Sequence, residues 1–319
     1  MFADDLFSEN LGKMPCVEAK NFASVSSALS RLSSEYSFLK TECIGRSVMG
    51  KPILAASLGT GENSVLISAA HHANEWVGTQ VMMCFIEQLC HAYVSDGELF
   101  GVLAKDILAC SRLYLVPLVN PDGVDLAQGK LASGGFFKLA KCIALGFPHI
   151  PFPQGWKANI NGIDLNLQYP AGWEQAKAIK FSQGYDRPAP RDYVGDGPLC
   201  APESIALARY TRRISPGIII ALHSQGEVIY WKYSTFEPTG SRELGQSMSE
   251  VSGYELFETP AESGNAGYKD WFIKEFDRPG YTLELGLGEN PLPEAQLPKI
   301  YADTAPMLIR AALWNCYKA

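Results

Sequence analysis

The sequence contains no run of Lys or Arg, no apolar stretch of membrane-spanning length and no Cys-x-x-Cys pair. With 27 basic and 34 acidic residues, its formal net charge is -7, so neither nucleic acid nor an anionic membrane surface is the expected partner. A helix that spans a bilayer needs about 20 consecutive apolar residues, and we therefore expect no membrane partner either. These absences favour a small molecule or a small peptide as the ligand.

The sequence also shows no linker between domains, no internal repeat and no secretory signal. Gly and Pro are scattered and no internal repeat is visible, so we expect a leader with a helix over residues 1–40 and one catalytic domain over 41–319. The start, MFADDLFSEN, is acidic and does not resemble a secretory signal. The eight cysteines lie mostly inside apolar patterns, which is typical of reduced, core-filling thiols in a cytoplasmic protein.

What the sequence does contain is an alternation of short apolar runs and helical patterns. Apolar runs predict strands over residues 42–44, 53–58, 65–70, 112–119, 217–222 and 281–285, and a further one in QGEVIYW. Helices are predicted from residue 75 and over 202–213, 239–252, 267–276 and 298–317, whereas 168–200 has the composition of a long irregular loop. Continuously apolar strands indicate a largely parallel sheet covered on both faces, and an initial hairpin makes it mixed. We predict an α/β fold.

Histidine is scarce, and the five present are His71, His72, His91, His149 and His223. His91 lies at the far end of a predicted helix and His149 in a loop rich in Pro and Phe, so we expect both to be structural. His72 and His223 differ, because each directly follows an apolar strand pattern, SVLISAA in one case and GIIIAL in the other. Glu75 follows His72 in a His-x-x-Glu spacing.

His-x-x-Glu alone occurs often by chance, so a metal site requires a third ligand. Because the carboxyl ends of parallel strands meet at one edge of a sheet, we expect His72, Glu75 and His223 to lie close together. Two imidazoles and one carboxylate form the protein ligand set of many catalytic zinc sites, in which the fourth position is left for water. The sequence therefore predicts a site for one zinc ion, Zn2+, although another divalent metal remains an alternative.

In the order and spacing of its motifs, the chain from about Ile44 to Leu285 resembles the zinc carboxypeptidase family. The motifs are IGRSVMGKPI, AAHHANEW, VPLVNPDG, NINGIDLN, LCAPES, ALHSQGE, GYKDW and YTLELG. HSQGEVIYW and WKAN are most similar to the branch that acts on bacterial cell-wall peptides, the γ-D-glutamyl-diaminopimelate peptidases and murein peptide amidases. The resemblance implies a single-domain α/β/α sandwich around a mixed, eight-stranded sheet.

Position by position, the resemblance implies that His72, Glu75 and His223 are the zinc ligands and that Glu284, in YTLELG, is the catalytic general base and acid. An ionised carboxylate on an apolar strand is costly unless it has a partner, and activated water would be that partner. Lys157 takes the place of an arginine that stabilises the oxyanion in relatives. Lysine supplies the charge without the two-pronged geometry.

Asp164, in GIDLN, matches a carboxylate that orients the first zinc histidine. Two departures from the family pattern concern the substrate. Enzymes that trim ordinary proteins have an arginine where this chain has Leu167, which cannot bind a terminal carboxylate in a bidentate manner. They also have a tyrosine at the position of Glu262. Routine trimming of protein C-termini is therefore not expected.

The candidate substrate-binding residues are chosen by position and charge. We expect Arg191, supported by Asn166, to bind a substrate carboxylate, and Glu227, just past His223, to bind the ammonium of a diaminopimelate side chain. The predicted activity is zinc-dependent hydrolysis of a small murein-type peptide, most specifically at γ-D-Glu-meso-diaminopimelate. Alternatives are a zinc carboxypeptidase of other specificity, an aminoacylase-like deacylase, and an inactive peptide-binding protein. The oligomeric state is not predicted.

Overall fold

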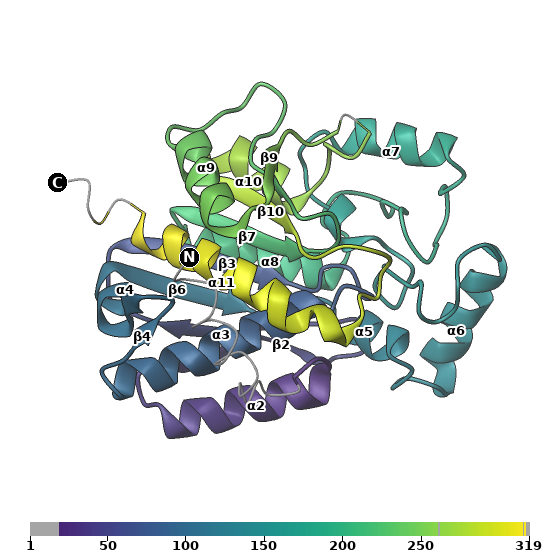
Figure 1. Cartoon of the computed structure of the whole chain (residues 1–319). Coiled ribbons are helices and arrows are strands. Elements are labelled where there is room, and N and C mark those ends of the chain that lie inside the picture. Colours follow the sequence, from purple (N-terminus) through teal and green to yellow (C-terminus); the bar gives the residue numbers. More distant parts are fainter. Residues whose placement is uncertain (1–18, 261, 315, 317–319) are drawn as a thin grey trace.

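A mixed eight-stranded sheet forms the centre of the computed structural model, which describes residues 19–260, 262–314 and 316 (Figure 1). Across the sheet the strands are β1 (Lys40–Arg46), β2 (Pro52–Leu58), β6 (Ser111–Val116), β3 (Asn63–Ala69), β7 (Ile218–His223), β10 (Gly280–Glu284), β8 (Val228–Tyr230) and β9 (Glu255–Phe257). β3 is parallel to both β6 and β7, and β7 is parallel to β10. β1 and β2 form the expected antiparallel hairpin. The predicted mixed sheet is confirmed.

The central strands bury both of their faces, which explains why their sequences are continuously apolar. In β3, Val65 and Ile67 belong to one hydrophobic cluster, whereas Leu66 between them belongs to a second cluster on the opposite face. Side chains of α2 (Phe22–Glu35), α3 (Val77–Val94), α4 (Ala104–Cys110), α9 (Ser241–Ser252) and α11 (Leu297–Leu313) contribute to the first cluster. Those of α8 (Pro202–Ile214) and α10 (Tyr268–Phe276) contribute to the second. Helices therefore cover both faces, as expected of an α/β/α sandwich.

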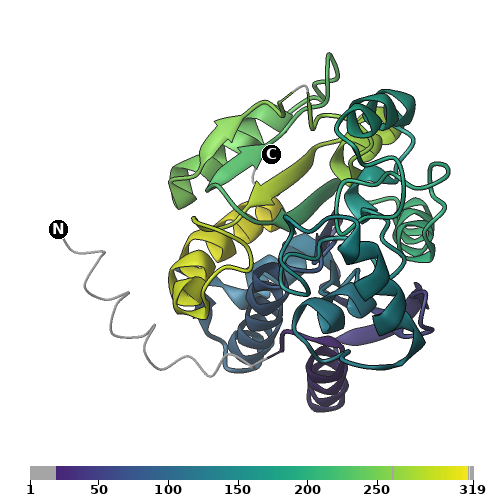
Figure 2. The same ribbon diagram turned by 90° about the vertical axis from the view of Figure 1, so that its right-hand side faces the viewer.

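The segments between β6 and β7 contain more helix than the sequence indicates. The Asn-Pro-Asp-Gly motif begins α5 (Pro121–Ala127), in which the Asn120 side chain accepts a hydrogen bond from the Gly123 amide and caps the helix. α6 (Gly134–Leu145) follows, and α7 (Trp173–Ser182) lies inside the stretch expected to be irregular. Figure 2 shows these teal segments gathered in front of the sheet.

The cysteines differ from the expectation of reduced, core-filling thiols. Cys110, at the end of α4, and Cys316, beyond α11, form a disulfide across 206 residues of sequence. Among the free cysteines, Cys43, Cys142 and Cys200 are exposed. The cysteines therefore do not support a cytoplasmic location. Among the described helices, none combines the length and the apolar character that crossing a bilayer requires.

Candidate active site

Three neighbouring parallel strands deliver polar side chains to one edge of the sheet. His72 comes shortly after the end of β3, and His223 and Glu284 are the last residues of β7 and β10. His223 and Glu284 are paired in register across those two strands. Because all three strands run in the same direction, residues far apart in sequence meet at their carboxyl ends.

His72, Glu75 and His223 form a compact cluster, with ligand atoms that all lie within 4.8 Å of one another. Nδ1 of His72 lies 3.0 Å from Oε1 of Glu75, and Nδ1 of His223 lies 3.1 Å from Oε2 of the same carboxylate. The two Nδ1 atoms are 3.3 Å apart. Each of the two imidazoles thus points its Nδ1 atom at a common point next to the Glu75 carboxylate.

A turn after β3 brings His72 and Glu75 together. The Glu75 amide donates to the carbonyl of His72 at 3.3 Å, and α3 begins only at Val77, two residues later than the sequence indicates. On the far side, the Ser224 amide donates to Oε2 of Glu75. His71 lies beneath the cluster, where its Nε2 is 2.9 Å from Oγ of Ser68. The backbone of Glu75 is therefore held in the turn, and one backbone amide holds its carboxylate.

Asp164 orients His72 from the other side of the ring. Its Oδ1 lies 3.1 Å from Nε2 of His72, so Nδ1 is the nitrogen that faces the cluster. The backbone amides of Asn166 and Asp192 donate to Oδ1 and Oδ2 of Asp164. Burial acts to raise the pKa of Asp164, but the charge of His72 and these hydrogen bonds outweigh it and hold that pKa well below the usual value.

The charges at the cluster are coupled. Burial acts to raise the pKa of Glu75, yet the charges of His72 and Lys157 hold it well below its usual value. For His72, burial acts to lower the pKa, but Glu75 and Asp164 raise it to about 10. Burial lowers the pKa of His223. Glu75 and Asp164 therefore remain carboxylates, and they favour positive charge at the point between them.

Lys157 and Glu284 complete the ring of charged side chains. Lys157, whose side chain is 16% exposed, donates from Nζ to Oε1 of Glu75 at 2.6 Å. Burial, and then the negative charge of Glu75, raise the pKa of Glu284 to about 8. A carboxyl group with such a pKa can accept and release a proton near neutral pH.

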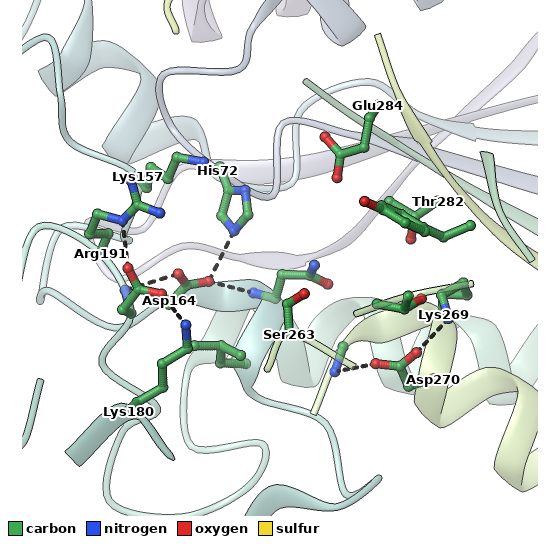
Figure 3. A pocket seen from close by; sticks show the side chains of 16 residues that line it. His72, Lys157, Asp164, Lys180, Arg191, Ser263, Lys269, Asp270, Thr282 and Glu284 are labelled. Carbon is green, nitrogen blue, oxygen red and sulfur yellow. Dashed lines mark hydrogen bonds and ion pairs between the residues drawn. The ribbon is translucent and has the colours of Figure 1, made fainter. Parts of the chain in front are cut away.

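The cluster opens into two adjoining hollows. The smaller has a volume of about 200 Å³ and the larger about 870 Å³. Both are lined by His72, Lys157, Lys180, Arg191, Asp192, Tyr230 and Glu284. Asn166, Leu167, Lys269 and Asp270 line the smaller one alone. Figure 3 shows Arg191, Asp164 and Lys180 on one side of the smaller hollow, with Glu284, Lys269 and Asp270 on the other.

The structure places most of the expected substrate-binding residues at these hollows. Arg191 lines both of them, and Asn166 lines the smaller one, where its Oδ1 accepts a hydrogen bond from the Tyr268 amide. Glu227 lines neither hollow. Its carboxylate pairs instead with Nζ of Lys299 at 2.8 Å.

Sequence reasoning missed most of the lining residues, among them Lys180, Asp192 and His149. Lys180 comes from α7, and Asp192, next to Arg191, binds it at 2.6 Å. His149, expected to be structural, lines the larger hollow. The sequence offers no signal that Lys180 lines the site, because its distance from Asp192 depends on the path of the chain between them.

The His72, Glu75 and His223 cluster fits a zinc ion. The two Nδ1 atoms lie 3.3 Å apart beside the Glu75 carboxylate, which favours positive charge between them, and a shared cation supplies that charge. The donor set of two nitrogens and one carboxylate is one that zinc prefers, and Asp164 supplies the hydrogen bond that typically orients a metal-binding imidazole.

A mixed sheet covered by helices, with two imidazoles and a carboxylate at its carboxyl edge, defines the class of zinc-dependent metallopeptidases. The sequence model of the zinc carboxypeptidase family matches residues 25–307. The chain belongs to the zinc carboxypeptidase family, as the motifs indicate.

Two curated relatives and one solved structure illustrate the similarity. The chain is 40% identical over 277 residues to gamma-D-glutamyl-L-diamino acid endopeptidase 1 of Lysinibacillus sphaericus, covering 86% of this chain and 67% of that protein. It is 25% identical over 240 residues to murein peptide amidase A of Escherichia coli, covering 70% of this chain and 75% of that protein. The structure of bovine thrombin-activatable fibrinolysis inhibitor in complex with tick carboxypeptidase inhibitor aligns with a TM-score of 0.69 at 18% identity, covering 92% of this chain and 96% of that one. This last likeness concerns the fold alone.

Proposed function

We propose that the protein hydrolyses the amide bond between γ-D-Glu and meso-diaminopimelate in small murein peptides. The observation that carries the hydrolytic part is the convergence of His72, Glu75 and His223, with Glu284 on the adjacent strand end. The substrate class is supported by the names of the two curated relatives, which refer to gamma-D-glutamyl-diamino acid and murein peptide bonds.

In this proposal, His72, Glu75 and His223 hold one zinc ion. When bound there, zinc supplies a Lewis acid that polarises a peptide carbonyl and lowers the pKa of water. Asp164 keeps the proton of His72 on Nε2, so that Nδ1 is free to bind the metal. The backbone amide of Ser224 holds the Glu75 carboxylate in place.

Glu284 transfers the proton. One of its carboxylate oxygens takes a proton from the attacking water as the new C–O bond forms, and then gives it to the amide nitrogen as the C–N bond breaks. Without a metal, burial and Glu75 raise the pKa of Glu284 to about 8, and a bound zinc ion would favour the ionised carboxylate that accepts the proton. Lys157 lies within reach of the same hollow and stabilises negative charge on the carbonyl oxygen.

Arg191 and Asn166 bind the substrate from the walls of the smaller hollow. Leu167, which also lines it, supplies no charge for a terminal carboxylate. Recognition of carboxylate therefore falls to Arg191, on the opposite side of the site from Glu284 (Figure 3). This arrangement differs from routine trimming of proteins, and membership of the zinc carboxypeptidase family disfavours the deacylase alternative.

The test is incubation of the zinc-loaded protein with L-Ala-γ-D-Glu-meso-diaminopimelate, with the products identified by mass. We expect L-Ala-D-Glu and free diaminopimelate, and no cleavage of the α-linked isomer under the same conditions. A panel of N-acyl amino acids serves as the control for a deacylase. Faster release from that panel, or intact tripeptide with one bound zinc per chain, would contradict the proposal and favour the deacylase or the peptide-binding alternative.

A further inference from the structure

Lys180 and Arg191 share a single carboxylate at the border of the two hollows. Nζ of Lys180 lies 2.6 Å from Oδ1 of Asp192, and Nε of Arg191 lies 2.5 Å from Oδ2. The side chains of Lys180 and Asp192 are each 13% exposed, whereas that of Arg191 is 42% exposed. We refer to Lys180, Arg191 and Asp192 as the cationic corner. The helix α7 and the loop that follows it supply its three members.

Most of the hydrogen-bond donors in the cationic corner are not used by the protein. A guanidinium has five N–H donors and an ammonium has three. The Nε group of Arg191 binds Asp192, and its two outer nitrogens make no hydrogen bond to the residues that the structure describes. Lys180 likewise uses its ammonium for Asp192. The outer edge of Arg191 therefore presents the paired donors that a carboxylate accepts in a bidentate manner.

Charge balance distinguishes this corner from the other ion pairs of the site. Lys269 is matched by Asp270 at 2.5 Å, one cation to one carboxylate. Lys157 and His72 both contact Glu75, but Asp164 also binds His72, so two carboxylates serve those two cations. In the cationic corner, two cations contact one carboxylate.

The neighbouring carboxylate of Asp164 does not restore that balance by direct contact. Its oxygens accept hydrogen bonds from the ring of His72 and from the backbone amides of Asn166 and Asp192. The surplus positive charge of the corner is thus left for an anionic ligand in the hollows.

The position of the cationic corner limits which part of a ligand it can meet. Lys180 and Arg191 line both hollows, as do His72 and Glu284, whereas Lys269 lines the smaller one alone. The corner also adjoins the proposed zinc ligands, because Asp164 accepts a hydrogen bond from the Asp192 amide at 3.1 Å and lies 3.1 Å from Nε2 of His72. A carboxylate bound at the corner therefore lies near the reacting bond, and not at the far end of the substrate.

We propose that Lys180 and Arg191 bind the free α-carboxylate of a γ-linked glutamate residue, and that Asp192 is the positioning residue that holds the two cations together. This inference rests on the proposed function. A γ-linkage leaves the α-carboxylate free on the residue that supplies the scissile carbonyl. In the α-linked isomer the free carboxylate is the γ one, and the acylamino group lies on the carbon beside the scissile carbonyl instead of on the carbon beside the carboxylate. The cationic corner thereby favours a glutamyl residue over residues that have no carboxylate at this position.

Three substrates test the assignment: L-Ala-γ-D-Glu-meso-diaminopimelate, the same tripeptide with the glutamate α-carboxylate converted to a carboxamide, and the tripeptide with a carboxamide on the diaminopimelate carbon next to the scissile nitrogen. We expect the wild-type protein to lose about 10- to 100-fold in kcat/KM on the glutamate carboxamide, because charge-assisted hydrogen bonds are lost. The Lys180→Ala and Arg191→Ala double variant should lose the same factor in kcat/KM on the parent tripeptide. Its kcat/KM values for the parent tripeptide and for the glutamate carboxamide should differ by less than about threefold, which is roughly the residual error of such comparisons.

The ratio of two substrates on one preparation does not depend on how much of a variant is folded. Lys177→Ala, on the same helix, serves as the matched control, because Lys177 packs over the Trp173 ring and does not line either hollow. It should keep the wild-type ratio.

Two outcomes overturn the assignment while leaving the proposed function intact. One is cleavage of the parent and the glutamate carboxamide at equal rates by the wild type. The other is a double variant that keeps its discrimination against the glutamate carboxamide, or loses discrimination only against the diaminopimelate carboxamide. Failure of the wild type to cleave any of the three substrates contradicts the proposed function itself.

Discussion

Lys157 donates from Nζ to Oε1 of Glu75 across 2.6 Å, so an ammonium directly contacts the carboxylate that both His72 and His223 approach. The backbone fixes this position, because the amide of Lys157 donates to the carbonyl of Pro190 at 2.8 Å. The cation of Lys157 is thus held at the edge of both hollows, beside the proposed zinc ligands.

Replacing Lys157 by Met keeps much of its length and removes its charge. We expect kcat to fall by about 10²- to 10³-fold with little change in KM, since the charge acts on the carbonyl oxygen in the transition state. Steady-state kinetics at saturating zinc would measure this. Lys177→Met provides a control at a lysine outside the hollows. A rise in KM with kcat unchanged would assign Lys157 to substrate binding and not to oxyanion stabilisation.

Replacing Glu284 by Gln removes the proton acceptor but keeps the shape. We expect kcat to fall by about 10²- to 10⁴-fold, because general base catalysis typically contributes that much, while zinc content per chain stays at the wild-type value. Metal analysis and kinetics on one preparation measure both quantities. Glu255→Gln, in the edge strand β9, is the control. A wild-type rate in the Glu284 variant would show that the general base is wrongly assigned.

Replacing Asp164 by Asn should weaken zinc binding. The hydrogen bond to Nε2 of His72 raises the basicity of the imidazole, and loss of such a partner typically costs about 10- to 100-fold in metal affinity. Competition with a chelator of known affinity measures this loss. Asp196→Asn, at a carboxylate that binds the Tyr193 hydroxyl, should leave the affinity unchanged. Equal affinities in the two variants would mean that Asp164 does not tune the site.

The sequence contains the information that brings His72 and His223 together. Each follows an apolar run long enough only for a buried strand, and β3 and β7 are adjacent parallel strands. Strand ends are therefore predictable, since apolar pattern and chain direction determine them. The fold class was predictable for the same reason.

Side-chain partners that depend on the path of long loops were not predictable. Glu227 is close to His223 in sequence, yet its backbone has a φ of 52° and its carboxylate pairs with Lys299. Lys180 reaches the hollows only because α7 folds back against the loop of Asp192. Cys110 and Cys316 show the same limit, since 206 residues separate them. Closeness in sequence and closeness in space diverge wherever the chain leaves the sheet.

The raised pKa of Glu284 predicts a pH dependence of stability in the metal-free protein. Burial first, and the charge of Glu75 second, raise the pKa in the folded state to about 8, whereas an unfolded glutamate titrates at about 4.3. Between these values folding takes up a proton, so stability is lost as the pH rises through this window, and the loss is complete above about pH 8.

Gln at position 284 carries no titrating proton, so this loss is absent in Glu284→Gln. For protein treated with a chelator, we expect the Tm of Glu284→Gln minus that of the wild type to increase from pH 5 to pH 9, which thermal unfolding in a series of buffers would measure. Zinc should reduce the increase, because a nearby divalent cation favours the ionised carboxylate. A difference that stays constant across this range would mean that Glu284 ionises in the folded protein as it does in the unfolded chain. Any shift of the Glu284 pKa that suits proton transfer near neutral pH would then have to come from the bound metal alone.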